Sequence, residues 1–329
     1  MQIHQKVNVR RFALASVFCA LAFNAYANDS VELTDGVIVD LAKGRVYLMR
    51  PKPAVESISI DNGSVIWANE NAAKPLALQE NKLVSQAELV DTPNVLSLVV
   101  MDVENDGQVV SSSKVTLPSN VSAFIDEGLT GRFSSRGVTV DQEAFVSWGF
   151  QPIPRQGMVM GPAEEDQGRD AGPPRMPAPT TSTIRLDLQT GDVSEIEPQD
   201  LPPSAARAFT PPGRSAAPSD PTTKQSADGR HTLTYERVAD DREWNKYVWT
   251  IVNNETGDEI GELQSHLSQS DFVVVDSDII VFETGAYVRR TESGLIDEPR
   301  SIRAVNLGTG VELWSRPVRD PVFRGQLPP

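Results

Sequence analysis

The sequence predicts an all-β chain in which short antiparallel hairpins repeat along most of its length. One phrase recurs, in which an apolar run is followed by Asp or Asn, then Thr-Gly, and then a second apolar run. It is clearest at 184–191, 250–257 and 302–310, and looser copies end at Gly63 and Gly107. Repeated hairpins that cannot bury an apolar face alone are typical of radially repeated sheets. We therefore predict a β-propeller of four-stranded antiparallel blades.

The elements of each repeat follow in the same order. A pair of short strands precedes the Gly-turn hairpin, first at 37–49 and then in the runs 75–86, 138–148 and 272–282. Turn-forming Asp, Asn, Ser and Gly separate the β-branched runs, as in ordinary hairpins. Each leading pair of strands and the Gly-turn hairpin after it form one unit of four strands. We count five such units, and thus five blades, at 36–69, 73–117, 121–197, 205–263 and 267–318. A further strand at Val31–Leu33 could close the ring with the last blade and remove an open sheet edge.

Two Pro-rich stretches interrupt this frame, at 151–181 and 198–228. Proline cannot donate to a strand ladder, and small polar residues cannot build a core. We expect both stretches to be disordered insertions on the surface. Insertions in repeat proteins usually emerge on one face, which is often the binding face, but exposed loops without a partner are the better account of this composition.

Residues 1–27 read as a secretory signal peptide. Three basic residues precede an apolar run of about a dozen residues, too short to cross a bilayer, and Ala25-Tyr26-Ala27 matches a cleavage site. Cleavage after Ala27 places the protein in the periplasm or, alternatively, outside the cell. The mature chain, 28–329, is expected to be one propeller domain without a transmembrane segment. Cys19 is the only cysteine and lies in the leader, so the mature chain has no disulfide, thiolate nucleophile or Cys-based metal site.

The charge of the chain narrows its possible partners. Lys and Arg number 30 against 45 Asp and Glu, a formal net charge of −15. Such an acidic protein should repel nucleic acid. Against this background, several arginines gather near the C-terminus. Arginine forks suit carboxylates and phosphates, but pairing with neighbouring acids is the better account. They are Arg289, Arg290, Arg300, Arg303, Arg316, Arg319 and Arg324.

Other possible sites are weaker. Asp102, Glu104 and Asp106 resemble the start of a calcium loop, but Ser113 stands where a bidentate Glu is needed, so an acidic hairpin turn explains them better. His231 and His266 fit no metal-binding spacing. Solvated loop residues are the better account of Met158, Met160 and Met176 than a soft-metal site. The sequence also contains no nucleophile elbow, Walker loop or dinucleotide fingerprint.

The repeats resemble those of the pyrroloquinoline-quinone-like (PQQ-like) β-propeller superfamily, whose blades close with Asp-x-x-Thr-Gly-x-x-x-Trp. Ser111, Glu195 and Gly261 depart from the Trp of that pattern, and Asn253 and Asn306 from its Asp. The matching positions are structural, since a large aromatic can staple neighbouring blades and Gly permits the turn. They are Gly63, Trp67, Gly107, Asp187, Thr190, Gly191, Thr256, Gly257, Thr309, Gly310 and Trp314.

Two functions are compatible with this resemblance. The first is a non-enzymatic scaffold, most simply a monomer, that binds a protein partner in the cell envelope. This hypothesis assigns no catalytic residue, cofactor or metal. The alternative is a quinone-dependent dehydrogenase or another small-ligand enzyme, which would need a central pocket with a cation site and stacking aromatics. The shared turn and Trp positions do not distinguish the two.

Overall fold

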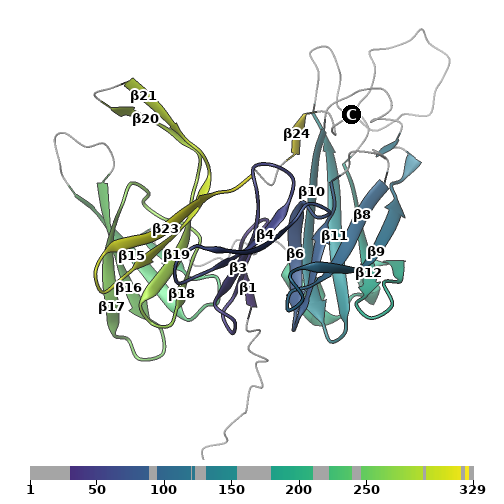
Figure 1. The fold of residues 1–329 in the computed structure, drawn as a ribbon, viewed down its shortest axis with the longest axis horizontal. Helices are drawn as coiled ribbons and strands as arrows, with labels where there is room; N and C mark the ends of the chain where they lie inside the picture. Colours follow the sequence, from purple (N-terminus) through teal and green to yellow (C-terminus); the bar gives the residue numbers. More distant parts are fainter. Residues whose placement is uncertain are drawn as a thin grey trace, which may run out of the picture.

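The computed structural model describes residues 30–88, 95–119, 121–122, 131–153, 179–209, 222–238, 246–291, 294–319 and 323–325. Predicted features at Met158, Met160 and Met176, and the signal peptide, lie outside these residues. The described part is almost entirely β, and it forms five antiparallel sheets of four or five strands and one two-stranded ribbon. In Figure 1 the strands of 223–317 lie on one side, those of 30–69 in the middle and those of 74–196 on the other side.

The sheets follow the chain, and we number them as blades. The first blade contains β1 (Ser30–Thr34), β2 (Val37–Asp40), β3 (Arg45–Met49), β4 (Val55–Ser59) and β5 (Val65–Asn69). The second contains β6 (Lys74–Gln79), β7 (Lys82–Gln86), β8 (Val95–Asp102) and β9 (Gln108–Thr116). The third contains β10 (Gly131–Val140), β11 (Glu143–Pro152), β12 (Thr180–Asp187), β13 (Val193–Ile196) and, from the far end of the chain, β24 (Phe323–Gly325).

The fourth blade contains β14 (Thr223–Gln225), β15 (His231–Val238), β16 (Lys246–Asn253) and β17 (Glu259–Ser265). The fifth contains β18 (Phe272–Val275), β19 (Ile279–Thr284), β22 (Ser301–Asn306) and β23 (Val311–Pro317). The ribbon β20 (Tyr287–Thr291) and β21 (Gly294–Glu298) is inserted between β19 and β22. The prediction of a β-propeller with four-stranded antiparallel blades is confirmed, and the first and third blades each have one additional strand, β1 and β24.

Burial follows position within a blade. The leading strands β2 and β18 are buried at every residue, whereas the outermost strand β9 alternates between exposed and half-buried residues. A strand covered on both faces reads as a continuous apolar run, and an outer strand with one wet face alternates. This is why Val37–Asp40 and Phe272–Val275 are the plainest strand signals in the sequence.

Four hydrophobic clusters fill the interfaces between blades. They join the second blade to the third, the first to the fifth, the first to the second, and the fourth to the fifth. None of these four clusters joins the third blade to the fourth. After β13 the chain forms a 3-10 turn, η1 (Pro198–Asp200), and a short helix, α2 (Pro203–Phe209), and α2 contacts β10 of the third blade.

Three details differ from the sequence expectation. The strand at Val31–Leu33 belongs to β1, which pairs with β2 of its own blade and not with the last blade. It is β24 that returns the C-terminal part of the chain to the third blade, along Gly131–Phe133. The segment 198–228 contains η1, α2 and all of β14, so the fourth blade begins at Thr223 and not near residue 205. Residues 210–221 of that segment lie outside the described part.

Candidate functional site

Each of the repeated Gly turns is held by hydrogen bonds from its own main-chain N–H groups. Oδ1 of Asp187, Asn253 and Asn306 accepts the N–H of the Thr three residues later, so Asn replaces Asp without loss of the bond. In all five blades the turn Gly donates its N–H to the carbonyl at the start of the turn. Each glycine has a positive φ. The turn is also tied to the preceding hairpin by one N–H···O=C bond per blade: Ile60 to Gly44, Val103 to Asn81, Leu188 to Gln142, Asn254 to Arg230 and Leu307 to Asp278.

The two motif tryptophans lie against the turn glycine of the next blade. A Cβ placed on Gly63 would lie 2.5 Å from Cγ of Trp314, and one on Gly107 would lie 2.6 Å from Cε3 of Trp67. The indole N–H of Trp314 also donates to the carbonyl of Ile60 at 2.5 Å. Trp314 thus joins the fifth blade to the first, and Trp67 the first to the second. Ser111 takes the same position over Gly191, whereas Cβ atoms on Gly257 and Gly310 would meet open space.

Charged side chains join the blades around the inner strands. Lys74 is 1% exposed, and its Nζ lies 2.6 Å from Oδ1 of Asp35 and donates to the carbonyl of Ser135 at 2.7 Å. Burial lowers the pKa of Lys74 even with Asp35 beside it. This one ammonium group therefore links the first three blades.

The fifth blade is tied to its neighbours in the same way. Arg300 pairs with Glu283 at 2.7 Å and donates to Oγ1 of Thr34 in the first blade at 3.1 Å. Burial alone would raise the pKa of Glu283, but the hydrogen bonds from Arg300 and Thr34 and the charges of Arg300 and Lys224 together hold this pKa below its usual value. Further pairs, Lys224–Asp271 at 2.6 Å and Arg319–Glu88 at 2.9 Å, connect the fifth blade to the fourth and second. Arg303 also pairs with Glu312, so three of the C-terminal arginines, Arg300, Arg303 and Arg319, are paired within the molecule.

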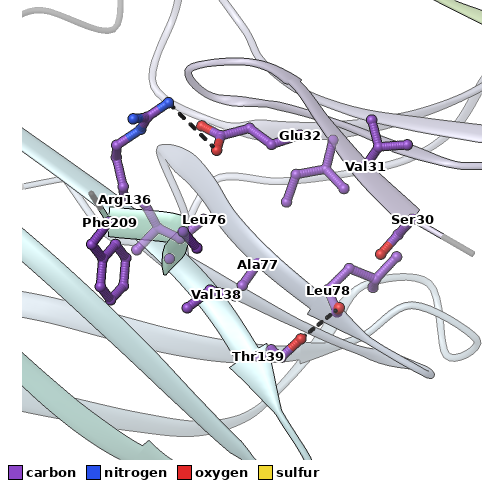
Figure 2. A pocket seen from close by; sticks show the side chains of 13 residues that line it. Ser30, Val31, Glu32, Leu76, Ala77, Leu78, Arg136, Val138, Thr139 and Phe209 are labelled. Atoms are coloured by element: carbon purple, nitrogen blue, oxygen red, sulfur yellow. Dashed lines mark hydrogen bonds and ion pairs between the residues drawn. The ribbon is translucent and has the colours of Figure 1, made fainter. Parts of the chain in front are cut away.

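A cavity of about 200 Å³ lies among β1, β2, β6, β10 and the end of α2 (Figure 2). Glu32 and Arg136 face each other across it, with an N–O distance of 3.9 Å, and Leu76, Val138 and Phe209 supply apolar walls. Burial raises the pKa of Glu32 despite Arg136 nearby. Pockets for small ligands typically measure about 300–1,000 Å³. With one aromatic lining residue, Phe209, this cavity lacks the stacking pair that a quinone site requires.

A different surface projects from the fifth blade. The ribbon β20–β21 extends away from the sheet that carries it (Figure 1). Val288 and Leu295, whose side chains are 64% and 70% exposed, are the two most exposed large apolar residues of the described part. Sequence reasoning missed this ribbon, because Tyr287–Thr291 does not alternate in polarity and the dipeptide Ser293-Gly294 is only a weak turn signal.

A basic cavity of about 270 Å³ lies where the first and fifth blades meet. It is lined by Arg50, Pro51, Lys52, Glu56, Arg316 and Pro317. Arg316 reaches across the interface and donates through Nε and Nη2 to the carbonyl of Gly63. The three cations outnumber the single carboxylate on a chain whose net charge is strongly negative. The cavity therefore has a positive local potential that favours anionic groups.

The remaining sequence candidates are explained by local structure. Asp102 caps its own turn by accepting the N–H of Glu104 at 3.1 Å, and it pairs with Lys82 at 3.1 Å. His231 is 8% exposed at the start of β15, and burial lowers its pKa. His266 lies just after β17, in the connection to the fifth blade. Over the described residues, no group of three or more His, Asp or Glu could hold a metal ion, and no helix is long and apolar enough to cross a membrane.

Comparison with known proteins gives only distant structural likenesses. No family model and no curated protein matches the chain. The Neurospora crassa Pan2 WD40 domain is 12% identical, with 86% of this chain and 66% of that chain covered and a TM-score of 0.27. The Cps50 (Swd1) β-propeller domain of Myceliophteria thermophila is 10% identical, with 87% of each chain covered and a TM-score of 0.29.

A quinohemoprotein alcohol dehydrogenase from Pseudomonas putida is 12% identical, with 88% of this chain covered and a TM-score of 0.28. This chain spans 43% of that enzyme and 66% of the Pan2 domain, less than two thirds of either. Because all three TM-scores are below 0.5, these likenesses carry no functional argument. The five consecutive antiparallel sheets and the interfaces between them define the chain as a β-propeller.

Proposed function

We propose that this chain is an exported, non-enzymatic propeller of the PQQ-like repeat type that binds a protein partner in the bacterial cell envelope. The observation that carries the proposal is the projecting ribbon β20–β21 with its exposed Val288 and Leu295. Apolar side chains held away from the body of a soluble protein are costly to hydrate, and they gain free energy when a partner covers them.

The basic cavity beside the first blade supports the same proposal. It lies next to β23, and β23 belongs to the blade that carries the ribbon. An acidic patch on the partner would meet Arg50, Lys52 and Arg316, while an apolar patch covers the ribbon. Such charge pairing mainly raises the association rate and fixes orientation. Within the cavity, Arg50 lies 3.7 Å from Glu56, and the two other cations leave the cavity with net positive charge. The charged groups of the inner strands pair with one another and act as structural ties between blades.

Site-specific photocrosslinking in cells tests this proposal. A photoreactive amino acid is placed at Val288, and in a matched variant at Val65, which is 45% exposed on the outer strand β5. We expect a discrete crosslinked protein with the probe at 288 and none with the probe at 65. A ribbon probe that crosslinks nothing, or the same species from both positions, contradicts partner binding by the ribbon.

Export is tested separately. We expect the mature protein to begin at Asn28 and to be released with the periplasmic fraction, as the leader predicts. Amino-terminal sequencing of the fractionated protein reports both. A mature protein that retains residues 1–27, or that stays in the cytoplasm, overturns the assignment to the envelope.

A further inference from the structure

The interface between the second and third blades contains a cavity at the position that a motif tryptophan fills at two other interfaces between blades. Its volume is about 250 Å³. It lies between the β6–β7 turn and β9 of the second blade and two turns of the third blade. The residues used below are Asn81, Lys82, Ser111, Gln142, Leu188 and Gln189.

The repeat identifies what normally fills this place. Ser111 stands four residues after Gly107, as Trp67 stands four residues after Gly63. Ser111 lies against Gly191 of the third blade, with its Cβ 2.9 Å from a Cβ placed there, just as Trp67 lies against Gly107 of the second. Ser113 Oγ adds a hydrogen bond to the carbonyl of Gly191. Cβ of Trp314 lies at a similar distance, 2.6 Å, from a Cβ placed on Gly63, so Ser111 occupies the place of a motif tryptophan but lacks the ring.

The polar contacts that surround the motif tryptophan between the first and second blades are also not repeated between the second and third blades. Between the first and second blades, Arg45 reaches across to the carbonyl of Val103 at 3.0 Å, and Lys43 pairs with Glu104 across the interface. Lys82, which begins β7 as Arg45 begins β3, instead pairs with Asp102 in its own blade at 3.1 Å. At the corresponding positions of the second blade, Ser111 thus replaces the ring, and Lys82 does not supply the bridging cation.

The empty position retains the chemistry that an indole uses. Leu188, 3% exposed, forms an apolar floor and corresponds to Ile60, whose carbonyl accepts the indole N–H of Trp314. Ser111 Oγ is buried and has no hydrogen-bond partner among the described residues. The carboxamides of Asn81, Gln142 and Gln189 surround the opening. These groups can bond the main chain of a peptide that brings a ring into the cavity.

We propose that this cavity is a socket for a tryptophan side chain supplied by another polypeptide, which would complete the interface between the second and third blades in trans. The inference does not depend on the ribbon β20–β21, which lies on the fifth blade. Its ligand is defined by the two intramolecular examples, in which the same chain places its own indole at the corresponding position.

Titration of the ¹⁵N-labelled mature protein with N-acetyl-tryptophanamide tests the socket. We expect saturable shifts of the Ser111 and Gln189 amides and of the Gln142 carboxamide at millimolar probe, and at least tenfold weaker effects from N-acetyl-leucinamide. In Ser111→Trp the chain fills its own socket, so probe binding should fall at least tenfold and the melting temperature should rise. Ser112→Trp, on an exposed neighbouring position, should bind as the wild type does.

A second variant tests the socket even if Ser111→Trp does not fold. Gln142→Ala leaves the packing unchanged and should weaken probe binding several-fold. If the wild type shows no saturable shift at the socket, or if Ser111→Trp folds and binds the probe like wild type, the socket is refuted. Equal weakening of binding by Ser112→Trp and Ser111→Trp would equally place the ligand elsewhere.

Discussion

Replacing two equivalent turn glycines by alanine should separate backbone strain from the contact between blades. Gly63 and Gly310 occupy the same repeat position and have nearly the same φ, +67° and +68°. Alanine in this left-handed region costs about 1–2 kcal/mol at either site. A Cβ on Gly310 would meet nothing within 4 Å, so Gly310→Ala should lose about that much stability.

Gly63→Ala carries a second cost. Its Cβ would lie 2.5 Å from Cγ and 2.6 Å from Cβ of Trp314, whereas non-bonded carbons prefer about 3.5–4.0 Å. The indole must therefore move by roughly 1 Å, which disturbs its 2.5 Å bond to the carbonyl of Ile60. Overpacking of this kind typically costs about 1–3 kcal/mol. The total for Gly63→Ala is then about 2–5 kcal/mol, a large part of the stability of an ordinary protein.

Urea unfolding of both variants and the wild type, followed by circular dichroism at equal protein concentration, measures the difference. We expect the midpoint of Gly63→Ala to fall well below that of Gly310→Ala, with similar m-values. Equal midpoints would show that Trp314 does not hold the fifth blade against the first. Trp314→Ala in the Gly63→Ala background supplies the control, because the extra cost of the added methyl group should disappear once the ring is gone.

Three further predictions concern the turns, the inner charges and the uneven blade packing. Asp187→Asn should leave the urea midpoint close to that of wild type, because Asn253 and Asn306 already make the same bond, whereas Asp187→Ala should lower it; equal midpoints for the two variants would contradict a role for the bond. The pKa of Glu283 is lowered in the folded state, so this carboxylate stabilises the fold above pH 4.5, and the effect is lost as the pH falls through the folded pKa. The pKa of Glu32 is raised in the folded state, so its contribution to the stability of the fold is lost as the pH rises from 4.5 through the folded pKa. Melting temperatures from pH 3 to pH 7 should therefore show Glu283→Gln less stable than wild type only toward neutral pH, and Glu32→Gln equal or more stable there; a pH-independent offset in either would refute this assignment. Amide hydrogen exchange should be faster in β15–β17 than in β2–β4, because the fourth blade shares one hydrophobic cluster and the first shares two; equal protection would overturn that ranking.

The blade frame could be predicted from the sequence because it is a local property. Each hairpin carries its own turn residues and its own alternation, so Asp276-Ser277-Asp278 between two β-branched runs suffices to place β18 and β19. The count of five blades follows by addition. Loop and strand boundaries between the third and fourth blades were harder, because the prolines of 198–228 concealed the short helix α2.

Contacts between blades could not be predicted from the local sequence pattern. Nothing near Lys74 in the sequence indicates that its ammonium group is buried between Asp35 and the carbonyl of Ser135, which lie 39 and 61 residues away. Val31–Leu33 is recognisable as a strand, yet only the fold decides that it pairs with β2 and contacts the second and fifth blades. Long-range partners are chosen by the fold as a whole, and local propensity leaves them open.

The departures from the repeat are more informative about function than the repeat itself. A motif Trp that lies over a turn Gly has a structural role, because its ring is buried between two blades and is not accessible to a ligand. Where the repeat is broken, unsatisfied chemistry appears: Ser111 leaves a cavity with an orphaned hydroxyl, and the ribbon inserted between β19 and β22 holds Val288 and Leu295 in water. Both features cost stability in the isolated chain, and a polypeptide partner that supplies a ring or an apolar surface would recover that free energy. Both proposed binding surfaces therefore lie where this chain departs from its own repeat, at Ser111 and in the ribbon β20–β21.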